Sequence, residues 1–190
     1  MKQKEVLFIT GNKSKLAETT KMAERFSVKI VGQKANLFEP MVSDSTKILI
    51  DKAKDAYKKF GKPLIVDDAG IYFGAYPNFP GVFTKFIIKL LGFNGIIKLL
   101  EGKSKDAYFK CTIGFIDEKL DQPLLFEGIS KGKITEKISI NFNGNFEFNS
   151  IFIPEGESKT FSEMSIEERS KHCHRDRALE KFLSWYVKEY

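Results

Sequence analysis

The sequence is poor in cysteine and in long apolar runs, and each shortage excludes a class of protein. Its two cysteines, Cys111 and Cys173, lie far apart and outside any metal-ligand spacing, which excludes a zinc ribbon and a disulfide framework. No apolar run approaches the length of a membrane span, and the first residues lack the features of a signal peptide. We therefore expect a cytoplasmic chain with reduced thiols and no membrane partner.

The chain also lacks internal repeats, low-complexity tracts and Pro/Ser-rich linkers, so nothing divides it into domains. Its 190 residues, of which 42% are hydrophobic and 29% charged, suit one soluble globular domain spanning 1–190. The 31 Lys and Arg exceed the 25 Asp and Glu, giving a net charge of +6. This excess fits an anionic partner but does not choose between a nucleotide and a polynucleotide.

Apolar runs alternate with helical patterns along the first third of the chain, which is typical of an α/β sheet with buried strands. The pattern predicts strands at 6–10, 28–31 and 64–66, the last ending at Asp67-Asp68, and helices at 13–26 and 45–60, the second capped by Ser45 or Thr46. Further along it predicts a helix over 83–100 broken at Gly92, a β-hairpin of 107–116 with 124–132, and a final helix from the capping box Ser165/Glu168 to about Tyr190. An apolar stripe on that helix indicates core or dimer contacts; it comprises Leu179, Phe182, Leu183 and Tyr186.

A first candidate site is the strand-to-helix junction from Thr10 to Lys15. Gly11 allows a tight turn, amides at a helix start favour anions, and Lys13 and Lys15 add positive charge. The junction is not a P-loop, because the GxxxxGK[ST] pattern is absent. It predicts a phosphate cradle, with an ordinary βα turn and polar cap as the alternative.

A second candidate is the pair Asp67-Asp68, directly after a predicted buried strand. Open α/β sheets bind ligands at the C-terminal ends of their strands. Mg²⁺ prefers one or two carboxylates together with substrate phosphates, and a carboxylate can also deprotonate water. The alternative is a solvated turn in which the aspartates make local hydrogen bonds.

A third candidate is the basic segment around His174-Arg175 near the final helix. Arginine offers a planar fork suited to nucleobase oxygens and ring nitrogens, whereas a charged helix face is the alternative. The neighbouring run from His172 to His174 does not predict a metal site, because adjacent helical residues point about 100° apart.

Together these segments resemble the inosine-triphosphate pyrophosphatase (Ham1-like) family, most closely its archaeal branch. The shared motifs are TGNxxKLxE at 10–18, a PG pair at 80–81, FxGxxxGxI at 126–134, IFxPxGxxxTFxEM at 151–164 and HRxxA at 174–178. The family's [ED]D(S/T)G(L/F) motif corresponds to Asp67–Ile71, where Ala69 and Ile71 differ from the pattern. They follow the family order along nearly the whole chain. The resemblance implies an elongated twisted mixed β-sheet with flanking helices, forming two lobes around a central cleft, in a homodimer.

The resemblance also implies a function and a set of site residues. The reaction is Mg²⁺-dependent hydrolysis of ITP, dITP and XTP to monophosphate and pyrophosphate, with Mn²⁺ as an alternative metal. Asp68 would accept the proton, with Asp67 supporting it and Ala69 beside the substrate. The metal would lie on Asp68 and on Glu39, for which Asp44 is the alternative. The triphosphate residues would be Thr10, Gly11, Asn12, Lys15, Lys52 and Lys85, and the base residues Phe146, Phe148, Asn149, Arg169, His174 and Arg175.

The base half of the implied site departs from the family pattern. Where the family has Phe-Gly-(Tyr/Trp)-Asp, this chain has Phe146-Glu147-Phe148-Asn149. A neutral amide thus replaces the acid that would accept from base N–H groups, which loses a charge-assisted hydrogen bond. Arg169 also replaces a lysine, and Cys173 replaces a serine. The triphosphate half keeps the family residues.

Three functional readings follow. The leading one is hydrolysis of non-canonical purine triphosphates. The second keeps this chemistry but shifts the base preference, because of Glu147 and Asn149. The third is a weakly catalytic protein that binds nucleotides or nucleic acid. The net positive charge favours this interpretation, whereas the Asp67-Asp68 pair argues against it.

Overall fold

The structure is a computed structural model that describes residues 4–37, 44–138 and 147–190 of the chain. Its contacts divide the chain into two compact units. The first unit comprises Met1–Asp68, Cys111–Gly128 and Arg175–Tyr190, and the second comprises Ala69–Lys110 and Ile129–His174.

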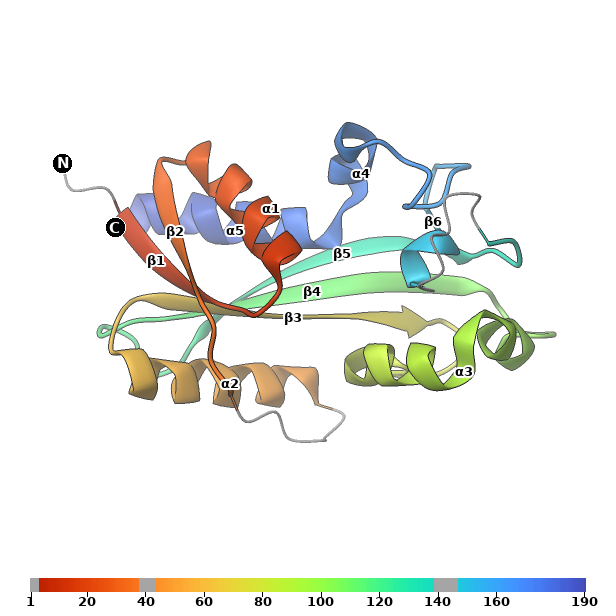
Figure 1. Cartoon of the computed structure of the whole chain (residues 1–190), viewed down its shortest axis with the longest axis horizontal. Coiled ribbons are helices and arrows are strands. Elements are labelled where there is room, and N and C mark those ends of the chain that lie inside the picture. The colour runs from red at the N-terminus through yellow and green to blue at the C-terminus, as the bar shows by residue number, and fades with distance from the viewer. Residues whose placement is uncertain (1–3, 38–43, 139–146) are drawn as a thin grey trace. The chain divides into compact units, whose positions relative to one another are not determined.

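Within the described residues, the strands form one six-stranded mixed sheet with α-helices (Figure 1), which confirms the α/β prediction. The strands are β1 (Lys4–Ile9), β2 (Val28–Gln33), β3 (Leu64–Phe73), β4 (Asp106–Ile116), β5 (Leu124–Ile134) and β6 (Phe152–Pro154), paired in the order β2-β1-β3-β4-β5-β6. The helices are α1 (Lys13–Glu24), α2 (Ser45–Phe60), α3 (Thr84–Leu99), α4 (Ile166–His172) and α5 (His174–Glu189), with 3₁₀ turns at Gly81–Phe83 and Phe148–Ser150. β1 pairs in parallel with both β2 and β3, whereas β5 and β6 are antiparallel.

In the first unit, helices cover both faces of the sheet (Figure 1). On one face, Leu49 and Ala53 of α2 pack against Leu64 and Val66 of β3, and all four side chains are fully buried. On the other face lie α1 and α5. Because both faces are covered, the central strands contain uninterrupted buried apolar runs, 6–9 in β1 and 64–66 in β3.

The stripe predicted on the final helix lies in the core of the first unit. Its four residues are at most 3% exposed, and Phe182 and Tyr186 contact the ring of Phe115 on β4 at centroid distances of 5.5 and 5.4 Å. The stripe therefore packs α5 onto the sheet and leaves none of these side chains for a dimer contact.

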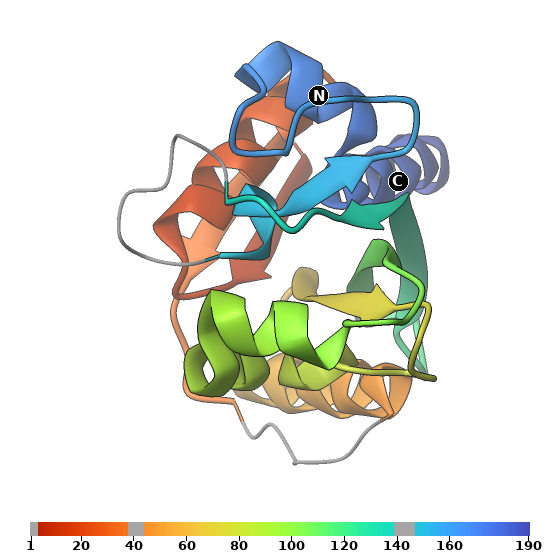
Figure 2. The same ribbon diagram turned by 90° about the vertical axis from the view of Figure 1, so that its right-hand side faces the viewer.

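The second unit has its own apolar core. Ile96 and Leu100, from α3 and its end, join Phe73 of β3 and Phe109 of β4 in one buried cluster with Phe152 of β6. The short strand β6 lies beside the end of β5 (Figure 2), with Ile153 opposite Lys133. The predicted helix break is confirmed, since Gly92 has φ 59° and ψ −169°, a conformation that glycine adopts without strain.

The prediction that the third strand stops at Asp67-Asp68 is wrong. β3 continues to Phe73, and its last three residues are buried. Adjacent aspartates usually indicate a turn, but here the carboxylate of Asp67 is only 5% exposed and forms an ion pair with Lys15. The ion pair satisfies the charge inside the protein, so the strand does not need to end at water.

Two helix predictions also need correction. The final helix is interrupted at Cys173, whose ψ of 122° is extended, so that α4 and α5 are separate helices and His174-Arg175 begin α5 instead of lying inside a longer helix. The capping box of Ser165 and Glu168 is confirmed, but it opens only α4. The cap of α2 is Asp44, which accepts from the backbone amides of Thr46 and Lys47, and not Ser45 or Thr46.

Gly70 is required where β3 meets the turn that precedes α3. A Cβ atom at this position would lie 2.3 Å from the carbonyl oxygen of Gly81. We expect Gly70→Ala to lower the free energy of unfolding by about 1–3 kcal/mol, as overpacking usually does. Chemical denaturation measures this loss. The matched control is Gly114→Ala in β4, whose nearest contacts would be at 3.4 Å; equal losses in both variants would contradict the steric explanation.

Candidate functional site

The junction between β1 and α1 is built as a helix cap. Asn12 is the N-cap, and its side-chain oxygen accepts from the amides of Ser14 and Lys15 at 3.0 and 3.1 Å. The hydroxyl of Thr10 accepts from the amide of Asn12 at 3.1 Å. Gly11 and Asn12 are exposed at this turn, which makes the start of α1 accessible to an anionic group.

Asp67 lies at the centre of a cluster of cations in the first unit. Its Oδ2 is 2.7 Å from Lys15 Nζ of α1 and 3.6 Å from Arg175 Nε of α5. Lys52 Nζ of α2 donates to the backbone carbonyl of Asp67 at 3.3 Å. Three elements distant in sequence thus each bring one cation to the same residue of β3.

The charge state of Asp67 follows from this cluster. Burial raises the pKa of its carboxyl, but the charges of Lys15 and Arg175, the hydrogen bond from Lys15 and the charge of Lys52 outweigh burial and hold the pKa below its ordinary value. Asp67 is therefore an ionised carboxylate whose Oδ2 is ion-paired with Lys15 and Arg175.

Asp68 points to the opposite face of the strand. Successive side chains of a strand alternate between faces. Leu64 and Val66 pack against α2, so Asp68 shares their face, while Asp67 faces α1 and α5. Asp68 is half-buried, in contrast to the almost fully buried Asp67, and the helix on its face carries Lys52. The two acids therefore have different surroundings, and a joint catalytic role for them stays a prediction.

Glu18 is a member of the cluster to which sequence reasoning gave no role. Its Oε2 accepts from Nη1 of Arg175 at 3.3 Å. It lies three residues after Lys15 on α1, a spacing that places two side chains on one helix face. That spacing indicates the proximity of Glu18 to Lys15, but it does not reveal Arg175, which comes from the other end of the chain.

Four of the residues predicted to contact the base are described in the second unit. The His174 ring stacks on Phe109 at 4.8 Å and 10°, and it is 8% exposed. Phe148 is 3% exposed and meets Phe73 edge-on at 5.7 Å, so its ring takes part in the core. Asn149 and Arg169 are half-buried. Their roles toward a base remain predictions.

Two predicted site residues, Glu39 and Phe146, lie outside the described residues. Of the others, Ala69 is half-buried in β3, and Lys85 is exposed in the first turn of α3. Asp44, the alternative to Glu39 as a metal ligand, already accepts two backbone hydrogen bonds as the cap of α2.

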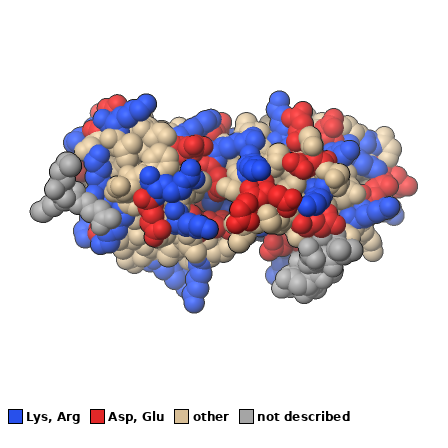
Figure 3. Space-filling view, turned by 90° about the horizontal axis from the view of Figure 1, so that it is seen from above, with Lys and Arg blue, Asp and Glu red and all other residues tan. Residues whose placement is uncertain are grey.

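The surface charge is mixed. On the face seen in Figure 3, Lys and Arg are interspersed with Asp and Glu, and they do not form one uninterrupted basic area.

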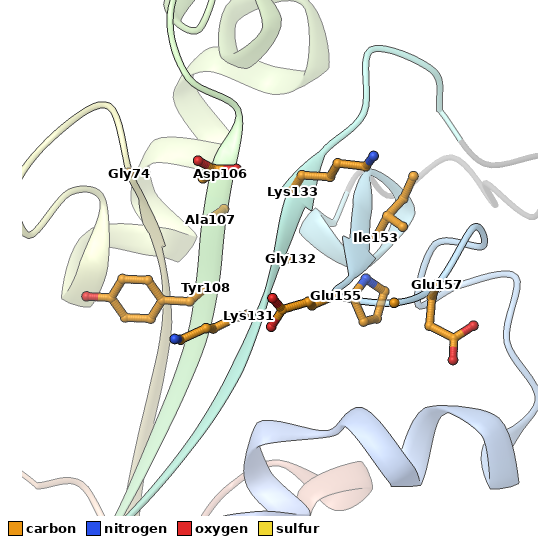
Figure 4. A pocket seen from close by; sticks show the side chains of 12 residues that line it. Gly74, Asp106, Ala107, Tyr108, Lys131, Gly132, Lys133, Ile153, Glu155 and Glu157 are labelled. Atoms are coloured by element: carbon orange, nitrogen blue, oxygen red, sulfur yellow. The ribbon is translucent and has the colours of Figure 1, made fainter.

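A cavity of about 530 Å³ lies in the second unit (Figure 4). Lys131 and Lys133 of β5, Asp106 and Tyr108 of β4, and Glu155 line part of it. None of the catalytic, substrate-binding or metal-binding residues predicted from the sequence is among the residues that line this cavity. The charged side chains that line it are of both signs.

The donor chemistry suits a hard cation. In the described part of the chain, no three His, Cys, Asp or Glu side chains gather as a complete metal cage. Mg²⁺ does not need such a cage, because it commonly binds one or two carboxylates together with water and substrate phosphates. The half-buried carboxylate of Asp68 fits that requirement.

Comparison with known proteins identifies the family. A model of the Ham1 family matches residues 6–185. The chain belongs to the Ham1 family. It is 42% identical over 178 residues to the dITP/XTP pyrophosphatase of Saccharolobus solfataricus, an alignment that covers 93% of this chain and 91% of that protein. It is also 36% identical over 177 residues to the inosine triphosphate pyrophosphatase of Yarrowia lipolytica, covering 93% and 92% of the two chains.

Solved structures agree on the Ham1 fold. A HAM1 protein from Coxiella burnetii is similar with a TM-score of 0.82 at 24% identity, covering 97% of this chain and 99% of that chain. The Ham1 protein of Staphylococcus aureus is similar with a TM-score of 0.77 at 22% identity, covering 98% and 100%. At these identities the likeness shows the fold alone.

The cluster around Asp67 should make stability depend on pH. We expect Asp67→Asn to cost about 3 kcal/mol of unfolding free energy near neutral pH, because it leaves buried cations without their counter-charge. The folded pKa of Asp67 lies below the ordinary value of 3.8, so its stabilisation is complete above that value and is lost as pH falls through the folded pKa. Urea unfolding of the wild type and of Asp67→Asn at several pH values between about 7 and 3 measures the difference in their unfolding free energies. That difference should become smaller as the pH falls.

The control for this experiment is Asp121→Asn, which changes an exposed aspartate of the same unit. It should change stability little at any pH. If the difference in unfolding free energy between wild type and Asp67→Asn stayed constant down to the lowest pH, this would contradict an ionised, ion-paired Asp67.

Proposed function

We propose that this protein hydrolyses non-canonical purine nucleoside triphosphates, such as ITP, dITP and XTP, to the monophosphate and pyrophosphate. The observation that carries the proposal is the match over more than nine-tenths of the chain to relatives named dITP/XTP pyrophosphatase and inosine triphosphate pyrophosphatase. The cationic cluster around Asp67 supports it, because a triphosphate needs positive charge at its site.

The phosphates are held by the first unit. The exposed turn at Gly11 and Asn12 offers the start of α1, and Lys15 and Lys52 bring ammonium groups to the side chain and the backbone carbonyl of Asp67. A triphosphate carries about four negative charges, and phosphoryl transfer depends chiefly on positioning and on neutralising the charge of the leaving group. These residues supply both the positioning of the triphosphate and the positive charge that neutralises its leaving group.

Asp68 activates the water. Its carboxylate takes a proton from water as the water oxygen bonds to the α-phosphorus. The bond from that phosphorus to the bridging oxygen breaks, and pyrophosphate departs with the electron pair. Asp67 is unsuited to this task, because it is 5% exposed and is already bound to Lys15.

Asp68, together with Glu39, would hold a divalent cation, for which Mg²⁺ is the first choice and Mn²⁺ the second. When bound, the cation neutralises phosphate charge at the reacting end of the substrate. Asp44 is less suited as a ligand, because its carboxylate caps α2.

Arg175 and His174 read the base. A 6-keto oxygen, present in inosine and xanthosine, accepts from arginine, whereas the 6-amino group of adenosine leaves the arginine without an acceptor. Polar groups left unsatisfied in a site reject the wrong substrate by about 10²-fold or more. Guanosine also carries the 6-keto oxygen, so its rejection needs a further contact.

A shifted base preference is a second candidate, favoured by Glu147 and Asn149. The amide of Asn149 both donates and accepts, whereas the family's acid only accepts. Nucleic-acid binding finds less support. A polynucleotide site is commonly a continuous basic patch, and the face in Figure 3 carries charges of both signs.

We also propose a cytoplasmic homodimer. Three large apolar side chains on α3 are exposed and suit burial against a second copy: Phe86 by 54%, Leu90 by 63% and Leu91 by 41%. No helix in the described ranges combines the length and apolar character needed to cross a bilayer.

A substrate panel tests the function. Pyrophosphate release from ITP, XTP, GTP, ATP and dUTP is measured with and without Mg²⁺, with an inorganic pyrophosphatase converting the product to phosphate. We expect Mg²⁺-dependent turnover, with kcat/KM for ITP and XTP about 10²-fold or more above that for ATP. Equal values for GTP and ITP would favour the shifted preference, and no turnover on any triphosphate would contradict the function.

Asp68→Asn tests the assigned base. We expect kcat for ITP to fall by about 10²-fold or more, because general-base catalysis contributes that much. The dissociation constant for ITP, measured by titration calorimetry, should stay within a few-fold of the wild-type value. Asp121→Asn serves as the control with wild-type turnover. Substantial activity in Asp68→Asn would show that another group accepts the proton.

A further inference from the structure

One oxygen atom of Asp67 binds cations from two helices. Oδ2 lies 2.7 Å from Nζ of Lys15 on α1 and 3.6 Å from Nε of Arg175 on α5. The two cations are therefore no farther apart than the sum of these distances, although 160 positions separate them in the sequence. All three side chains are largely buried, with exposed fractions of 5% for Asp67, 18% for Lys15 and 16% for Arg175.

Glu18 adds a second carboxylate to this arrangement. It accepts from Nη1 of Arg175 at 3.3 Å and is 35% exposed. Arg175 is thus held by two acids from different elements, Asp67 on β3 and Glu18 on α1, and it shares Asp67 with Lys15.

We propose that Asp67 is a positioning residue that holds both Lys15, which binds the phosphates, and Arg175, which recognises the base. Base selectivity then depends on a carboxylate that contacts neither the phosphates nor the base. This inference rests on the function proposed above. Asp67 places both cations through one oxygen, and Glu18 orients the guanidinium of Arg175.

The physical basis is the repulsion between two neighbouring cations in a poorly solvated place. At such separations like charges repel strongly unless an anion lies between them. Without the Asp67 carboxylate, both long side chains would move apart and lose their defined orientation. Catalysis and recognition depend on groups held in place before the substrate arrives, so both the phosphate contact and the base contact would weaken.

This linkage predicts a specific pattern among variants. Asp67→Asn should lower kcat/KM for ITP and for ATP, because Lys15 is disturbed for both, but more for ITP, because the 6-keto contact is lost as well. The ratio of kcat/KM for ITP to that for ATP should fall at least about fivefold, the lower range of coupling between sites. Glu18→Gln should lower the same ratio, while kcat/KM for ATP stays near the wild-type value.

The controls separate positioning from a merely structural role. Asp67→Glu keeps the carboxylate and should retain most of the wild-type ratio. Asp117→Asn alters another buried aspartate of the first unit, 1% exposed and bound to Tyr190, and should leave the ratio unchanged even if stability falls. Circular dichroism and thermal melts of each variant show whether it is folded under the assay conditions.

The outcomes are distinct. A reduced ratio in Asp67→Asn and Glu18→Gln, with the ratio kept in Asp67→Glu and Asp117→Asn, supports the inference. An equal loss for ITP and ATP in Asp67→Asn overturns it, and if that variant does not fold, an unchanged ratio in Glu18→Gln overturns it. A wild type that hydrolyses neither triphosphate contradicts the proposed function itself, which is a different failure.

Discussion

The buried negative charge of Asp67 is the constraint on which the rest of the candidate site depends. A carboxylate that is 5% exposed in the middle of a strand is costly unless cations and hydrogen bonds compensate it. Here the compensation comes from Lys15 on α1, Arg175 on α5 and, through the backbone, Lys52 on α2. The charge therefore draws together segments from the beginning, the middle and the end of the chain. Those same segments carry the residues proposed to bind the phosphates and the base.

Local signals in the sequence were sufficient for much of the fold. Gly11 and Asn12 mark the start of α1, Gly92 marks the break in α3, and Ser165 with Glu168 marks the start of α4, because each effect acts within a few residues. The apolar stripe of α5 likewise follows from helical spacing. These features needed no knowledge of distant contacts.

The wrong prediction at the end of the third strand involves partners distant in sequence, whereas the misassigned cap of α2 has a local cause in the hydrogen bonds of Asp44. The Asp67-Asp68 pair reads locally as a turn, and only Lys15 and Arg175 explain why β3 continues through it. Cys173 is extended and separates α4 from α5. No glycine or proline at this position indicates the break in the sequence. For the same reason the sequence predicted a set of phosphate-binding residues but did not indicate that Arg175 shares a carboxylate with Lys15.

Strand alternation gives the two aspartates different surroundings, which suit the different roles proposed for them. Asp67 faces α1 and α5, where cations occupy its oxygens and hold its pKa low, so it cannot readily accept a proton. Asp68 faces α2 and is half-buried, which leaves it the acid of the pair suited to contact water and a metal ion. An anchor and a base one residue apart need opposite faces of one strand, because the anchor must be buried among cations and the base must reach the substrate. The continuation of β3 through both residues provides that separation, which a turn at the same place would not enforce.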